Sequence, residues 1–189
     1  MSLLPAVDGA AFPDSVFLDP PHHYAYIVRD LDEAIEEMVL RLGAGPFLRP
    51  PRASSQRASS AFGAAAFEHS SAFGQCGSFA IELMQIHNVA PARAKRAFDP
   101  PYGRLHHVAW VVPSLDRGIE SLESRGFDHY LRAGFGEIDF AFHDARGTLG
   151  HDIELHQECG PLRGFWSAIR EASIDWDGRN PSRTLGPPA

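Results

Sequence analysis

Two glutamates of this sequence lie in apolar, strand-like stretches, and two pairs of adjacent histidines stand at the start of other such stretches. Glu82 lies in IELMQ and Glu154 in IELHQ, while the pairs are His22–His23 and His106–His107. Imidazole nitrogens and carboxylate oxygens are ligands that suit divalent first-row ions. Two neutral imidazoles and two carboxylates would neutralise such an ion, which offsets the cost of burying the carboxylates. These residue types therefore predict a metal site.

The elements that must position these side chains follow the same order twice, as hydrophobic periodicity and Pro, Gly and Ser punctuation indicate. The first half has a strand at 23–28, a helix at 30–43 and strands near 46–52, 60–73 and 76–86. The second half has a strand at 106–112, a helix at 114–126 and strands near 127–133, 137–143 and 150–157. Each half is thus a βαβββ module, with a histidine on its first strand and a glutamate on its last.

A direct comparison of the two halves supports an internal repeat. When residues 22–41 are shifted by 84 positions onto 106–125, nine of the twenty positions are identical. They are His22/His106, His23/His107, Ala25/Ala109, Val28/Val112, Leu31/Leu115, Asp32/Asp116, Ile35/Ile119, Glu36/Glu120 and Arg41/Arg125. The two IEL stretches are only 72 positions apart, so the second copy has shorter internal loops.

The repeat divides the chain into consecutive segments. We expect a lead-in segment at 1–21, a first module at 22–90, a connector at 91–103 and a second module at 104–158. Residues 159–189 should hold a short helix near 162–173 and a tail with little fixed structure. Because neither module can cover the apolar face of its sheet alone, the two should share one cleft.

Composition limits the partners that the chain can have. Of 189 residues, 44% are hydrophobic and 22% charged, which is typical of a globular protein. The formal charge of −7 argues against a nucleic-acid partner, since phosphate contact needs a basic face. No stretch approaches the roughly 20 apolar residues of a membrane span, so we expect a cytoplasmic protein that does not use a membrane. The two cysteines form no CxxC motif, which gives no support to a disulfide or a thiolate site.

Four segments, HYAYIVRDLDEA, IELMQ, HVAWVVPSLDRG and IELHQ, resemble in this order the motifs of the vicinal oxygen chelate superfamily. The pattern is most similar to glyoxalase I and methylmalonyl-CoA epimerase, and the superfamily also includes extradiol dioxygenases and bleomycin-resistance proteins. The resemblance spans roughly residues 22–158. It implies an α+β fold in which two tandem βαβββ modules form a cleft-lined, partly closed mixed sheet with the helices outside.

The same resemblance implies the ligands and the chemistry. His23, Glu82, His107 and Glu154 are expected to hold one divalent ion, which could be Ni, Co, Zn, Mn or Fe. The expected activity is that of a lyase or isomerase on a small, enolisable, oxygenated substrate, such as a thiol conjugate or an acyl thioester. A base of raised pKa is expected beside the metal, with Glu154 as the first candidate and Glu82 as the second. A homodimer is one arrangement open to such a chain.

Two other functions and a metal-free cleft stay open. An extradiol-type dioxygenase would hold iron with two histidines and one glutamate, and Glu82 argues against it because a fourth protein ligand closes a position needed by substrate or oxygen. A module that binds a small molecule without turnover is the other alternative, although such proteins typically lack the ligand set. The sequence ELMQIHN, which begins at Glu82, has no Asn four residues after that glutamate, so glutathione as a substrate lacks support.

Several other polar residues have less definite expectations. His156 should share a strand face with Glu154 and either line or fill the cleft. Glu68 could be a second base, but a solvated glutamate is the favoured interpretation. Surface or packing roles are the default for His69, His87, His129 and His143. Solubilising charge rather than anion binding is favoured for Arg49, Arg52, Arg57, Arg93, Lys95 and Arg96.

Overall fold

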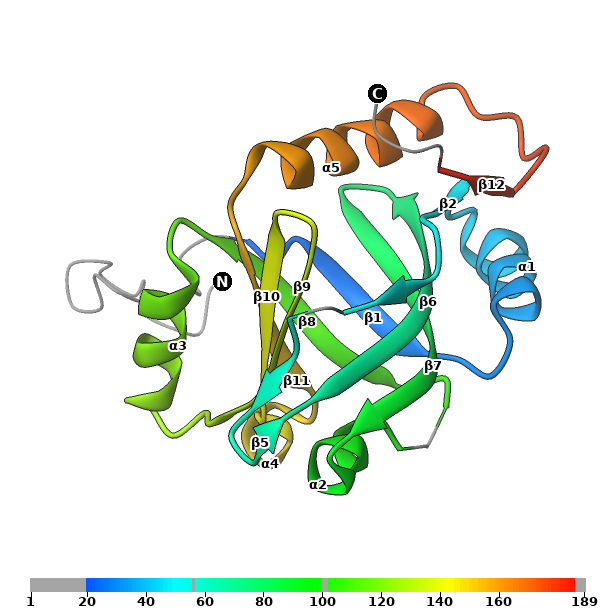
Figure 1. Ribbon diagram of the computed structural model, residues 1–189. Coiled ribbons are helices and arrows are strands. Elements are labelled where there is room, and N and C mark those ends of the chain that lie inside the picture. The colour runs from blue at the N-terminus through cyan, green and yellow to red at the C-terminus, as the bar shows by residue number, and fades with distance from the viewer. Residues whose placement is uncertain (1–19, 56, 100–101, 186–189) are drawn as a thin grey trace, which may run out of the picture.

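The structure is a computed structural model that describes residues 20–55, 57–99 and 102–185 (Figure 1). The predicted lead-in segment lies almost wholly outside the described residues. The first half of the chain forms β1 (His23–Ile27), α1 (Leu31–Leu42), β2 (Phe47–Arg49), β6 (Ala66–Cys76) and β7 (Phe79–Ala90). Three two-residue strands stand between β2 and β6, namely β3 (Ala53–Ser54), β4 (Ser59–Ser60) and β5 (Gly63–Ala64).

The second half repeats this order. It forms β8 (Leu105–Val112), α3 (Leu115–Glu123), β9 (His129–Phe135), β10 (Ile138–His143), a short α4 (Arg146–Leu149) and β11 (Asp152–Gln157). The connector contains α2 (Ala92–Lys95) and a turn of 3-10 helix, η3 (Arg96–Phe98). The chain continues into α5 (Gly160–Ser173) and β12 (Ser182–Thr184).

All these strands belong to one mixed sheet. The central eight strands have the order β2-β6-β7-β1-β8-β11-β10-β9, so the first and last strands of each module lie side by side and the modules join through β1 and β8. β1 is parallel to β7 and β8 is parallel to β11, whereas β1 and β8 are antiparallel. Within the described part of the chain, the end strands β12 and β5 do not pair, so the sheet is open. The predicted α+β architecture is confirmed.

The two long module helices start and stop where local chemistry directs. Asp30 caps α1, because its side chain accepts hydrogen bonds from the backbone N–H groups of Asp32 and Glu33. Gly43 ends α1 in the left-handed conformation with φ of 64°. Ser114 caps α3 in the same way by accepting from the Arg117 N–H. The caps satisfy backbone groups at the helix ends, and the buried residues of each helix, such as Ile35 and Ile119, form its apolar face.

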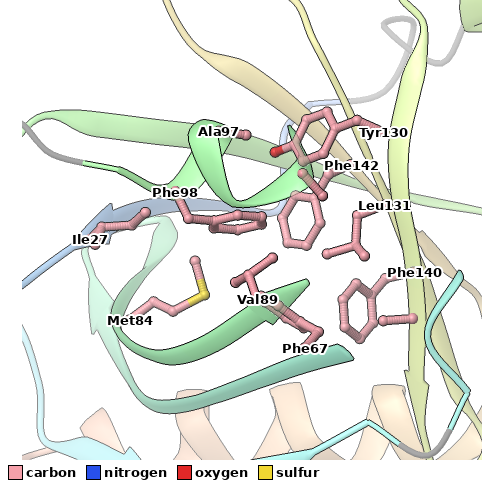
Figure 2. Close-up of a cluster of buried hydrophobic side chains, with 12 residues drawn as sticks. Ile27, Phe67, Met84, Val89, Ala97, Phe98, Tyr130, Leu131, Phe140 and Phe142 are labelled. Carbon is pink, nitrogen blue, oxygen red and sulfur yellow. The ribbon is translucent and has the colours of Figure 1, made fainter. Parts of the chain in front are cut away.

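Hydrophobic residues are buried in three clusters, one under each module helix and one between the modules. Leu31 and Ile35 of α1 share a cluster with Phe47 and Leu83 of the strands, among others. Leu115 and Ile119 of α3 share a second cluster with Ile153 and Leu155 of β11, among others. The third cluster combines side chains of both modules, such as Phe67 and Met84 of the first with Leu131, Phe140 and Phe142 of the second (Figure 2). Both helices therefore lie on the outside of the sheet, and the inner faces share one core.

The tail differs from its prediction. Residues 182–184 form β12, which pairs in parallel with β2 and places Ser182 opposite Phe47. The three residues have no alternating pattern of their own, and they become a strand because β2 offers a free edge. Residues 186–189 lie outside the described part. No helix among the described residues is long and apolar enough to cross a membrane.

The segment after β2 links the two ends of the central sheet. β3 pairs with β6 of the first module, and β4 pairs with β9 of the second. Ser55, which lies between them, donates its N–H to Phe67 O at 2.9 Å and its hydroxyl to Gly134 O at 3.0 Å. The segment thus crosses between the modules at one side of the space that they enclose.

Candidate metal centre

Strand register brings the four predicted ligands together. Ala25, two residues after His23, is opposite Glu82 on β7, and Ala109, two residues after His107, is opposite Glu154 on β11. Across the antiparallel junction, His23 is opposite Ala109 and Ala25 is opposite His107. The pairing is thus the same in both modules about a pseudo-twofold. A shift of one residue on any of these strands would turn its ligand to the outer face.

The distances between ligand atoms are those of a coordination polyhedron. Oε2 of Glu82 lies 3.3 Å from Nε2 of His23 and 3.4 Å from Nε2 of His107. Oε2 of Glu154 lies 3.3 Å and 3.1 Å from the same two nitrogens. Donor atoms bound at about 2.1 Å to one ion are about 3.0 Å apart at a right angle and about 3.4 Å apart at the tetrahedral angle. The four imidazole–carboxylate distances therefore suit one shared ion, and all four residues offer a ligand atom within 4.8 Å of the others.

Burial of the quartet supports the same conclusion. His23, Glu82, His107 and Glu154 are each at most 5% exposed. Nε2 of His23 and Nε2 of His107 make no hydrogen bond to any described residue. Buried polar atoms nearly always have a partner, so two such nitrogens facing two carboxylates fit a metal ion well. The four residues are also the one group of at least three possible metal ligands found in the described part of the chain.

The four groups perturb one another's ionisation. Burial opposes a charge on His107, but the Glu154 and Glu82 carboxylates outweigh it and raise the pKa of His107 to about 10. Burial likewise opposes a charge on His23, but the neighbouring Glu154 and Glu82 carboxylates outweigh it and raise the pKa of His23. Burial also opposes charge on the carboxylates, yet the imidazoles of His107 and His23 lower the pKa of Glu82. Without an ion, protons thus balance the negative charge of the site.

The expected raised pKa of the base is wrong for both glutamates. Burial acts to raise the pKa of Glu154, but His156 and His107 outweigh it and hold that pKa well below the usual range. The raised pKa was an expectation from the family resemblance, with Glu154 as the first candidate for the base. Three imidazoles next to its carboxylate reverse the sign, so Glu154 stays ionised and is a weak base.

A second layer of side chains holds the ligands. Ser71 donates its hydroxyl to Oε1 of Glu82 at 2.7 Å, and Nε2 of His156 lies 2.9 Å from Oε2 of Glu154. The described residues offer no hydrogen bond to Oε1 of Glu154. One carboxylate therefore has both oxygens engaged, whereas the other keeps one oxygen without a partner from the protein.

The quartet lies at a cavity of about 810 Å³ that both modules and α5 enclose. Glu82, Glu154, Ser71 and His156 belong to its wall, and so does His69. The predicted position of His156 on the cleft face is confirmed. Trp166 of α5 packs against His23 of the quartet, with 5.1 Å between the ring centroids. The volume of the cavity falls within the range of sites that bind small molecules.

Sequence reasoning missed two groups of cavity residues. His69 is 8% exposed, and the alternation Phe67, His69, Ser71 along β6 could have placed it on the cleft face. Phe165 and Trp166 were expected only as part of an amphipathic helix, and nothing local indicates which surface that helix covers. His143, fully buried on β10, fits the packing role that was its default.

The remaining predicted polar residues take structural roles. Glu68 forms an ion pair with Arg52 at 2.8 Å and is partly exposed, which supports the solvated interpretation. Arg57 pairs with Asp139, and Arg49 pairs with Asp32. His106 lies beside the quartet rather than in it, with Nδ1 2.8 Å from Nδ1 of His107. Both cysteines are free.

This fold and site agree with a comparison against protein families. Residues 22–142, more than half of the chain, match the model of the Glyoxalase/Bleomycin resistance protein/Dioxygenase superfamily. The chain belongs to this superfamily, and the predicted vicinal oxygen chelate relationship is confirmed. No curated protein sequence matches the chain.

Solved structures share the architecture at low sequence identity. A hypothetical protein from Bacillus halodurans is 18% identical, with a TM-score of 0.51, and the match covers 75% of this chain and 95% of that one. Methylmalonyl-CoA epimerase from Mycobacterium tuberculosis is 21% identical, with a TM-score of 0.49, and the match covers 76% of this chain and 91% of that one. The likeness to the Bacillus halodurans protein concerns the fold alone.

Proposed function

We propose that this protein is a metal-dependent lyase or isomerase that removes a proton from the carbon next to a carbonyl group of a small substrate. The observation that carries the proposal is the buried quartet of two histidines and two glutamates at the cavity, with ligand-atom separations of 3.1–3.4 Å. A divalent ion bound there would supply Lewis-acid stabilisation to the oxygen on which negative charge develops. His23, Glu82, His107 and Glu154 would hold it.

Glu154 is the proposed base. In the reaction, its carboxylate accepts the substrate proton, the C–H electron pair forms the C=C bond of an enolate, and the carbonyl π pair moves onto the oxygen. Return of the proton to the same or another carbon, with a C=O bond formed again, completes an isomerisation. Oε1 of Glu154 is the carboxylate oxygen without a protein partner, whereas both oxygens of Glu82 are engaged. Because a carboxylate beside a metal cation is a weak base, the substrate should be one whose acidity rises strongly on chelation.

Two nearby residues would support this step. His156, 2.9 Å from Glu154, holds the carboxylate in place. Trp166 covers His23 and limits the access of water, which strengthens electrostatic interactions within the site. The dioxygenase alternative has no comparable support, because four protein ligands leave few positions for both substrate and oxygen.

The test is exchange of the substrate α-proton with deuterated water, followed by proton NMR. The panel comprises 2-hydroxyacetophenone, a hemithioacetal of phenylglyoxal and methylmalonyl-CoA. We expect metal-dependent exchange with at least one member, and Glu154→Gln should lower the rate by about 10²–10⁴-fold. Metal content is measured in the same samples to separate loss of the base from loss of the ion. Oxygen consumption with a catechol and no exchange would instead favour the dioxygenase.

A further inference from the structure

The wall of the cavity beyond the quartet is strongly aromatic. The rings come from both modules and from α5, and several touch each other, as Phe67 and Phe142 do at 5.8 Å between centroids. Six of them are Phe67, Phe135, Phe140, Phe142, Phe165 and Trp166. An apolar group seated among these rings would leave water and gain ring contacts.

Two of these six rings, Phe165 and Trp166, come from a helix outside the repeat. α5 follows the second module and lies beyond the residues that match the superfamily model. It crosses above the strands in Figure 1. Its Phe165 packs on Phe73 of β6 at 4.9 Å, and its Trp166 packs on Phe73 at 5.4 Å and on His23. The aromatic cover over the quartet is therefore an addition to the two modules.

The positive charges at the cavity are already paired. Arg52 and Arg57 contribute to its wall, and their side chains are 56% and 51% exposed, which places them toward solvent. Arg52 pairs with Glu68, and Arg57 pairs with Asp139. A phosphate group of a carrier such as coenzyme A would have to compete with these carboxylates. The opening thus offers little net attraction to an anion.

A few polar atoms on the cavity wall lack partners. They are Nδ1 of His69, Nδ1 of His156 and Nε1 of Trp166, which form no hydrogen bond with the described residues. Buried polar atoms of folded proteins are normally satisfied by protein, water or ligand. A wall with so few polar atoms among its aromatic rings suits a ligand whose oxygens stand together at one end.

We infer that the substrate has an aromatic or similarly apolar body without phosphate groups, and that its metal-binding oxygens stand together at one end. This inference rests on the proposed function, since the quartet must hold the ion that those oxygens approach. It goes further by placing the specificity in the rings of β6, β10 and α5. Thioesters of coenzyme A and conjugates of glutathione are poor candidates for this cavity.

Chelating probes of constant head group test the inference. Acetohydroxamate, benzohydroxamate and 2-naphthohydroxamate are titrated by calorimetry into the protein loaded with the ion that it retains, and coenzyme A is added as a competitor. We expect affinity to rise by at least about tenfold from the acetyl to the benzoyl probe, because burial of the ring removes apolar surface from water. Coenzyme A should not displace the aromatic probes.

A matched pair of variants locates the effect. Phe165→Ala should reduce the gain from the aromatic body and leave acetohydroxamate binding unchanged. Phe79 packs on Tyr24 and does not belong to the cavity wall. Phe79→Ala should therefore change neither the affinity gain of the aromatic probes nor the affinity for acetohydroxamate. Absence of bound metal would defeat the proposed function and the inference with it. Bound metal with equal affinities for all three probes, no binding of any probe, or displacement by coenzyme A would overturn the inference alone.

Discussion

The rings of His106 and His107 face each other through their Nδ1 atoms at 2.8 Å, so one must donate and the other accept. Nε2 of His106 lies 3.0 Å from the carbonyl oxygen of Ala97, which can only accept a hydrogen bond. The proton of His106 is therefore on Nε2, and its Nδ1 accepts from Nδ1–H of His107. Burial, with His107 nearby, lowers the pKa of His106 to about 3 and keeps the ring neutral. Nε2 of His107 is left as the ligand atom.

The first prediction follows from this chain of hydrogen bonds. His106→Phe keeps a ring to stack on Phe98 but removes the acceptor that fixes the His107 tautomer. We expect metal affinity to fall by about 10–100-fold, as for other residues that orient metal ligands. The measurement is calorimetric titration of the metal, with nitrogen NMR of His107 to report the tautomer. His87→Phe, on an exposed part of β7, is the control. Equal affinity in both variants would contradict the assignment.

A second prediction concerns protons released on metal binding. Because the pKa of His107 is raised to about 10, its ring carries a proton at pH 7, and a metal ligand must be neutral. Binding should release at least one proton, and affinity should rise with pH from 6 to 9 by up to about tenfold per unit for each proton. Calorimetry in buffers of different ionisation enthalpy counts the protons. If metal binding released no proton at pH 7, the His107 ring would already be unprotonated in the metal-free protein, which would contradict its raised pKa.

The third prediction concerns Ser71, which supports Glu82 from the neighbouring strand. Ser71→Ala removes the 2.7 Å hydrogen bond and leaves a buried carboxylate oxygen without its donor. We expect the free energy of unfolding of the metal-free protein to fall by about 1–3 kcal/mol. Chemical denaturation measures it. Ser70→Ala is the control, because it removes a hydroxyl from the preceding residue, whose partner is the exposed His87. It should lower the free energy of unfolding by less than about 0.5 kcal/mol. Similar losses in both variants would refute the role of Ser71.

The fold and the meeting of the four candidate ligands were predictable because both follow from repeated local patterns. Strand alternation assigns the glutamates of the two IEL stretches to a face, and the nine identical positions align His23 with His107. The edge strand β12 was not predictable, because it exists through its pairing with β2. The cover formed by α5 was not predictable either, since an amphipathic pattern shows that a helix has a buried face but not what that face meets. The sign of the Glu154 pKa shift depends on neighbours that only the assembled strands bring together.

The proposed function and the substrate inference both require that the quartet binds a metal ion. Elemental analysis with calorimetry tests this most directly. Protein purified without chelator is assayed for bound metal, stripped, and titrated with Ni, Co, Zn, Mn and Fe, beside Glu82→Ala and the control Glu68→Ala. Glu68 lies on the same sheet but pairs with Arg52 outside the quartet. We expect one ion per chain in the unmodified protein and in Glu68→Ala, with binding lost or weakened by orders of magnitude in Glu82→Ala. No binding of any of the five ions, or equal binding by both variants, would contradict it.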